Sequence, residues 1–104
     1  MTELIEEDQW VWIVVQDPGQ NEQVLGQRDE ERDETFIPTF LTREEALQCL
    51  NLLVRDKGRK YEVQAIQIEE LSRQATKKGL VLFVLNGSGE LMETLRGPAK
   101  QTPA

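Results

Sequence analysis

The chain has 104 residues, of which 38% are hydrophobic and 30% charged, a balance typical of a folded domain rather than of a disordered chain. Its formal net charge of −7 disfavours nucleic acid and anionic membranes as partners, because both present negative phosphates. There is no histidine, so the commonest general base and metal ligand is missing, and the single cysteine cannot form an internal disulfide.

No apolar run approaches the roughly 20 residues that a membrane helix needs. The acidic N-terminus also lacks the basic and apolar parts of a secretory signal. We therefore expect a cytoplasmic protein. Composition predicts a single domain over residues 1–96, with a frayed end over residues 1–8 and a disordered tail over residues 97–104.

Residues 9–16 (QWVWIVVQ) are rich in strand-forming residues and apolar on both faces, which predicts a central strand. Trp10, Trp12 and Val14 would share one face of that strand. The adjacent Pro and Gly in residues 17–22 predict a turn, and residues 23–27 predict a weak second strand.

Residues 28–34 (RDEERDE) are all charged. We expect a solvated loop with its own internal ion pairing. The alternatives are a cation site or a docking loop for a basic partner, although the run lacks the ligand spacing and central glycine of a calcium loop.

Residues 35–54 predict a strand, a helix start and an amphipathic helix. Pro38 donates no ladder hydrogen bond, so this strand should be an edge strand or reach its end there. Thr42 and Glu45 form a capping-box pattern, and Gly58 is the expected helix stop. The apolar stripe of the helix would consist of Ala46, Leu47, Cys49, Leu50, Leu53 and Val54.

The remaining chain continues the alternation of strands and helices. Residues 60–68 alternate as a strand does, and residues 69–78 predict a weaker helix that ends at Gly79. Residues 80–85 (LVLFVL) predict a buried strand. Residues 86–89 (NGSG) predict a hairpin turn, and residues 90–95 either the returning strand or a short helix.

The predicted order is therefore βββαβαββ, an α+β (α/β layer) domain with a mixed sheet of five or six strands packed on two helices. The strand–helix–strand passages favour some parallel pairing with right-handed crossovers. Two similar crossovers would place both helices on one side of the sheet, yet residues 9–16 and 80–85 are apolar on both faces. Either the helices divide between the faces, or long side chains, loops and termini cover the second face, or another molecule covers it.

Few residues offer site chemistry. Cys49 lies on the apolar stripe, which favours a buried structural thiol over a nucleophile. A zinc site is not expected, because zinc needs several nitrogen or sulfur ligands and this chain has one thiol and no imidazole. Ser72 and Ser88 have no base at a recognisable spacing, and Gly87-Ser88-Gly89 fits a hairpin better than a phosphate loop. We expect no catalytic residue, no cofactor and no metal, and hence no enzyme.

Two family resemblances follow from short motifs. Residues 36–47 (FIPTFLTREEAL) resemble the "P-x-F-T-x-x-E-A" passage of SseB N-terminal-type domains, with Leu41 inserted between the Phe and the Thr. Residues 80–89 are similar to the "glvlNPG" ending of that family, with Gly87 in place of the Pro. The resemblance covers residues 35–89.

The second resemblance is to a small uncharacterised domain of photosynthetic organisms. Residues 17–23 (DPGQNEQ) are similar to its "NPGTENEG" turn, and residues 43–46 to its acidic helix start. Both resemblances imply an α/β domain and supply no catalytic residue. The families are named for secretion or stress contexts at most.

The favoured function is a non-catalytic protein-interaction domain. It would bind a protein partner, or form a homodimer, through the face of Trp10, Trp12 and Val14 or through an exposed strand edge. The alternative is a small-ligand-binding domain with a cleft near the strand ends, around residues 17–21 and 86–89. An enzyme that uses carboxylates is the third hypothesis.

Overall fold

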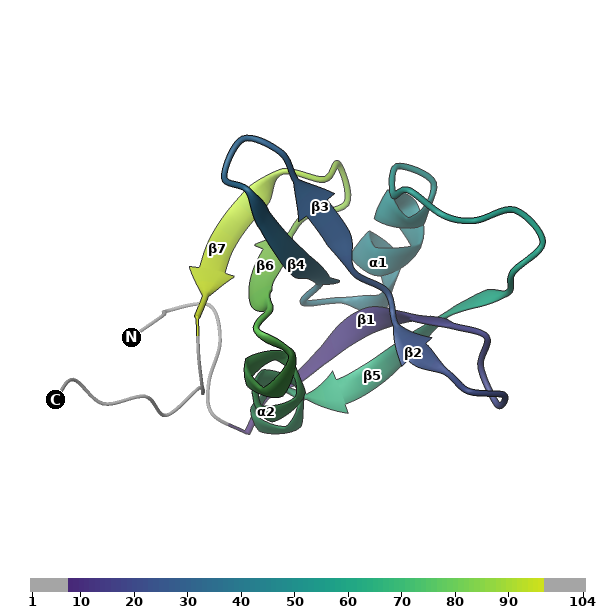
Figure 1. Ribbon diagram of the computed structural model, residues 1–104, viewed down its shortest axis with the longest axis horizontal. Helices are drawn as coiled ribbons and strands as arrows, with labels where there is room; N and C mark the ends of the chain where they lie inside the picture. The colour runs from purple at the N-terminus through teal and green to yellow at the C-terminus, as the bar shows by residue number, and fades with distance from the viewer. Residues whose placement is uncertain (1–7, 97–104) are drawn as a thin grey trace, which may run out of the picture.

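The computed structural model describes residues 8–96 and contains two helices and seven strands there (Figure 1). In chain order they are β1 (Trp10–Gln16), β2 (Gln23–Val24), β3 (Gln27–Asp29), β4 (Glu34–Thr39), α1 (Arg43–Leu50), β5 (Tyr61–Gln67), α2 (Ile68–Lys78), β6 (Val81–Leu85) and β7 (Leu91–Leu95). The predicted α+β class is confirmed. The predicted tail, and all but the last residue of the predicted frayed end, lie outside the described residues.

The strands form two sheets instead of the single sheet that the sequence predicted. A three-stranded antiparallel sheet has the order β2-β1-β5, and a four-stranded sheet has the order β3-β4-β6-β7 with β4 and β6 parallel. The predicted count of five or six strands is too low because residues 23–29 form two strands. Leu25 is buried between them and donates its N–H to the Val14 carbonyl at 2.8 Å, so the chain turns from one sheet into the other.

One pair of residues joins the two sheets. The Trp12 N–H donates to the Phe40 carbonyl at 2.8 Å, and the Phe40 N–H donates to the Trp12 carbonyl at 2.9 Å. The middle of β1 is thereby hydrogen-bonded to the residue that follows β4. Through this bridge, β1 is a strand of the three-stranded sheet and is also hydrogen-bonded to the four-stranded sheet.

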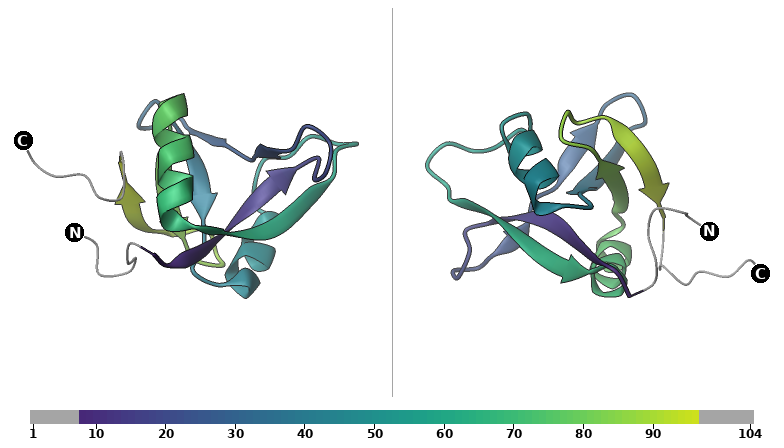
Figure 2. Two further views of the ribbon diagram at one scale, coloured as in Figure 1. Left: turned by 90° about the horizontal axis from the view of Figure 1, so that it is seen from below. Right: turned by 180° about the vertical axis from the view of Figure 1, so that it is seen from behind.

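The two helices cover opposite faces of β6 (Figure 2). Leu82 and Val84 lie in one core cluster with residues of α2, whereas Phe83 and Leu85 lie in another with Ala46 of α1. Alternate residues of a strand point to opposite faces, so both faces of the apolar run are buried. Of the alternatives left open by the sequence, the structure has the helices divided between the faces, because β5 pairs with β1 in the other sheet and the two crossovers are not equivalent.

The start of α1 follows the capping prediction in part. The Glu45 N–H donates to Thr42 Oγ1 at 3.1 Å, as expected of an N-cap. The Glu45 carboxylate, however, accepts from the Thr42 hydroxyl at 3.1 Å. In a complete capping box it would accept from the Thr42 N–H instead.

The end of α1 comes earlier than predicted. The helix ends at Leu50, because the Leu52 and Leu53 N–H groups bond three residues back, to the carbonyls of Cys49 and Leu50. Gly58 has a positive φ of 85° but does not end the helix. As a result, only part of the predicted stripe is in the core: Ala46 and Cys49 are buried, Leu50 and Leu53 are half-buried, and Leu47 and Val54 are exposed.

The two predicted turns, residues 17–22 and 86–89, each connect the strands of a hairpin, and a third hairpin occurs in the charged run. Residues 86–89 connect β6 to an antiparallel β7, and Gly79 ends α2 with a φ of 70°. The charged residues 28–34 form the β3–β4 hairpin, so the predicted loop is shorter than expected. β4 is internal to its sheet, but Pro38 lies beyond the end of β3 and needs no partner there; the strand-end prediction is right and the edge prediction wrong.

Candidate functional site

The predicted face of Trp10, Trp12 and Val14 is graded in burial. Trp10 is 58% exposed, Trp12 is half-buried, and Val14 is 1% exposed. Trp12 packs, with Val63 of β5, against the core cluster that includes residues of α1, and Val14 lies directly opposite Val63. Val14 therefore belongs to the core and cannot contact a partner, which corrects the predicted face.

The uncovered part of this face lies at the start of β1 and the end of β5. In the register of the two strands, Trp12 is opposite Ala65 and Trp10 is opposite Gln67. Both Ala65 and Gln67 are exposed. We call Trp10, Trp12, Ala65 and Gln67 the open end of the sheet. The sequence pattern did not identify Ala65 and Gln67 as part of this surface. The one sequence feature that places them on a common face is that they flank Ile66 in an alternating strand.

The strand β5 also forms an edge of its sheet, since within residues 8–96 it pairs with β1 alone. The Ile68 N–H donates to the Gln9 carbonyl at 2.9 Å, and the Lys60 carbonyl accepts from the Asp17 N–H at 2.8 Å. In an antiparallel ladder, these bonds turn the backbone groups of even-numbered β5 residues toward β1. The groups that point outward are those of Tyr61, Val63, Ala65 and Gln67.

The other sheet edges in the described part of the chain are less suited to pairing. β2 has two residues, and β3 has three, two of them charged. The ladder of β7 is interrupted by a register shift between Val84 and Leu85. β5 has seven residues in unbroken register and contains neither Pro nor Lys, the residues that usually protect an edge.

A separate cleft of about 610 Å³ lies where β1 ends and β5 begins. It is lined by both polar and apolar residues: Gln16, Gln23, Val24, Leu25, Gly26, Gln27, Arg28, Glu30, Val54, Asp56 and Tyr61. The Tyr61 hydroxyl accepts from the Asp56 N–H at 2.7 Å, which fixes the phenol within this lining. The predicted loops, residues 17–21 and 86–89, do not line it, and they lie apart from each other in both Figures 1 and 2.

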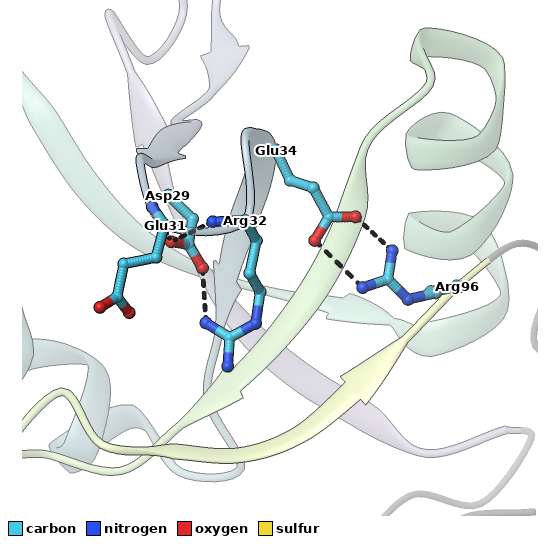
Figure 3. A network of polar contacts seen from close by, with 5 residues as sticks. All are labelled: Asp29, Glu31, Arg32, Glu34 and Arg96. Atoms are coloured by element: carbon cyan, nitrogen blue, oxygen red, sulfur yellow. Dashed lines mark hydrogen bonds and ion pairs between the residues drawn. The ribbon is translucent and has the colours of Figure 1, made fainter.

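The charged hairpin pairs internally, as predicted (Figure 3). Arg32 binds Asp29 at 2.8 Å, and this hydrogen bond lowers the pKa of the Asp29 carboxyl. Arg96 binds Glu34 through both guanidinium nitrogens and lowers the pKa of Glu34. The Arg32 guanidinium also lies 5.9 Å from the centroid of the Phe83 ring. Arg28 also pairs with Asp33, so both arginines of the hairpin are held by its own carboxylates.

The remaining candidate residues occupy structural positions. Cys49 is buried, as predicted, and burial raises the pKa of its thiol. Ser72 is buried on α2, and Ser88 lies in the β6–β7 turn, where its N–H donates to Asn86 Oδ1 at 2.9 Å. Within residues 8–96, no group of three or more His, Cys, Asp or Glu side chains is arranged to hold a metal ion.

Comparison of the chain with protein-family models, with curated proteins and with solved structures found no match. Within residues 8–96, neither helix has the length and apolar character of a membrane-spanning helix. A function for this chain therefore has to be inferred from its own residues.

Proposed function

We propose that this chain is a non-catalytic, cytoplasmic protein-interaction domain that binds through the open end and the outward edge of β5. The observation that carries this proposal is a Trp side chain, 58% exposed, on the strand next to a regular and unpaired edge. An added strand gains backbone hydrogen bonds from such an edge, while neighbouring side chains provide specificity. Exposed Trp is among the residues that contribute most to protein interfaces.

The chemistry of the site favours a polypeptide as the partner. A strand edge offers alternating N–H and C=O groups, which match those of another extended chain. The net charge of −7 and the absence of histidine argue against phosphate-rich partners and against general-base catalysis. The likeness of residues 35–89 to SseB N-terminal-type domains agrees with a non-catalytic role, and we retain membership of that family as a proposal.

The test is Trp10→Ala, with Leu52→Ala as a matched control. Both side chains are large, apolar and exposed, at 58% and 63%, but Leu52 follows α1 and lies outside the open end. We expect Trp10→Ala to weaken association at least about tenfold, whether with a captured protein or with the chain itself, and Leu52→Ala to leave it unchanged. Equal effects of the two variants, or no association of any kind, would contradict the proposal.

The second candidate function is binding of a small polar ligand in the cleft. The observation that favours it is that the side-chain amides of Gln16 and Gln23 line the cleft together with Tyr61. A thermal-shift screen with amino acids, sugars and nucleotides tests it. A stabilising compound whose effect disappears in Gln16→Ala would support this function, and a screen without any shift would count against it.

A further inference from the structure

We infer that the partner of the β5 edge is a second copy of this chain, bound by antiparallel pairing of the two β5 strands about Gln64. This inference rests on the proposed function and names its partner. The pairing would continue the sheet across the dimer, in the order β2-β1-β5-β5-β1-β2.

The backbone of β5 selects this register. The outward residues are Tyr61, Val63, Ala65 and Gln67, so both ends of the strand point outward. With the two-fold axis at Gln64, Tyr61 pairs with the second copy's Gln67, and Val63 with the second copy's Ala65. Every outward N–H and C=O is then satisfied. A shift by one hydrogen-bonded pair would leave an outward residue unpaired on each strand.

The side chains are compatible with the same register. Gln64 meets its own copy, and an amide can both donate to and accept from another amide. Glu62 lies opposite the second copy's Ile66, so no like charges are directly opposed within the strands.

The open end would adjoin the second copy in this dimer. Trp12 is opposite Ala65 in one copy, and Ala65 is opposite the second copy's Val63, which packs against a core cluster that includes residues of α1. The second copy's β5 would therefore border the open end on the face that carries Trp12.

The charges that flank β5 are complementary in this arrangement. Arg59 and Lys60 precede the strand, and Glu69 and Glu70 begin α2 directly after it. Continuing the register places Arg59 opposite the second copy's Glu69. Arg59 already pairs with Asp17 of its own chain, so Lys60 beside it is the cation that would meet this carboxylate. By strand alternation, Lys60 shares the face of Ile66, the face on which α2 packs. Two such attractive contacts, one at each end, oppose the repulsion between two chains of net charge −7.

The solution mass and a charge exchange test the inference. By light scattering over a roughly hundredfold range of concentration, we expect the wild-type chain to reach twice its 12.0 kDa. Lys60→Glu and Glu69→Lys should each weaken the dimer about tenfold, and the double variant should restore it, because the two sites exchange charge. A monomer throughout, or a double variant no stronger than the singles, would overturn the inference.

A proline variant tests the edge itself. Ala65→Pro removes an outward N–H but none of the bonds to β1, so the variant should keep its far-ultraviolet circular dichroism and lose the dimer. Ala65→Ser keeps the N–H and should remain a dimer. A dimer that survives Ala65→Pro contradicts pairing through β5.

The failures of the two proposals are distinguishable. A monomeric chain that captures another protein through Trp10 would overturn the second copy as partner and leave the interaction function standing. A chain that associates with nothing would overturn both.

Discussion

Ser72 is a residue whose environment does not match its chemistry. Its side chain is buried on α2, and its hydroxyl has no hydrogen-bond partner within residues 8–96. Burial of an unpaired hydroxyl costs free energy, and Ala is a better helix former than Ser.

We therefore predict that Ser72→Ala raises the free energy of unfolding by about 1 kcal/mol. Urea unfolding measures this change. Ser88→Ala, in the exposed turn, is the control and should change stability by less than about 0.5 kcal/mol. A clear loss of stability in Ser72→Ala would mean that the hydroxyl is hydrogen-bonded in solution.

Cys49 shows the opposite case, a residue well matched to its site. Burial raises the pKa of its thiol above the usual 9.0, so the neutral form is favoured in the folded chain. The stability that the neutral thiol contributes is complete below the unfolded pKa and is lost as pH rises through the folded one. We predict that a disulfide reagent at neutral pH labels Cys49 slowly in the native protein and rapidly in denaturant. Equal rates would contradict its burial.

Single residues differ in how far sequence predicts their roles. The burial of Cys49 and the Thr42 cap follow from helical periodicity and from a motif three residues apart, both of which are local. The difference in exposure between Trp10 and Val14 does not follow from local sequence. Both lie on the same face of β1, and their exposure depends on which distant parts of the chain pack over each end of that strand.

At the scale of elements, the segment between α1 and β5 is held by the side chain of Gln27. Its amide bonds both backbone groups of one residue, as a paired strand residue does. The Gln27 amide donates to the Val54 carbonyl at 2.9 Å and accepts from the Val54 N–H at 2.8 Å. This pair fixes an exposed loop to the start of β3.

We predict that Gln27→Ala lowers the free energy of unfolding by about 1–2 kcal/mol, since two hydrogen bonds are lost. Amide exchange at Val54 should accelerate. Gln23→Ala, an exposed glutamine on β2, serves as the control. Unchanged exchange at Val54 in Gln27→Ala would show that the loop is held in another way.

Elements were predictable where the pattern is apolar and periodic. Residues 9–16 and 80–85 form strands as expected, because apolar runs of this length fit buried strands. The charged residues 28–34 could not be predicted as a hairpin, because β3 and β4 gain their stability from pairing and from Phe36, which stacks on Phe83 at 4.3 Å. Residues 23–29 divide into two strands because the partners of the two halves lie in different sheets.

For the molecule as a whole, the class and the parallel pair β4–β6 follow from the alternation of strands and helices. The second sheet could not be predicted, because both β1 and β4 are apolar enough to accept β5 as a neighbour. Because β5 pairs with β1, it lies at the edge of the three-stranded sheet. The candidate site depends on this pairing.

Glu34 at the start of β4 and Arg96 just after β7 link two strands that β6 separates in the four-stranded sheet. Their hydrogen bond lowers the pKa of Glu34 below its usual 4.5, so this contribution to stability is present above that pH and is lost as pH falls. We predict that Glu34→Gln makes stability less dependent on pH below about 5, as measured by thermal unfolding. Because the pair is exposed, the effect should be small and should weaken in high salt. An unchanged acid profile would contradict the link.

Amide exchange along β5 in concentrated and dilute samples tests binding through this edge most directly. We predict that the outward amides of Val63, Ala65 and Gln67 become protected only when the protein associates. The inward amides of Gln64 and Ile66 should be protected at every concentration, because they bond to β1. Outward amides that exchange rapidly in an associated sample would contradict binding through this edge.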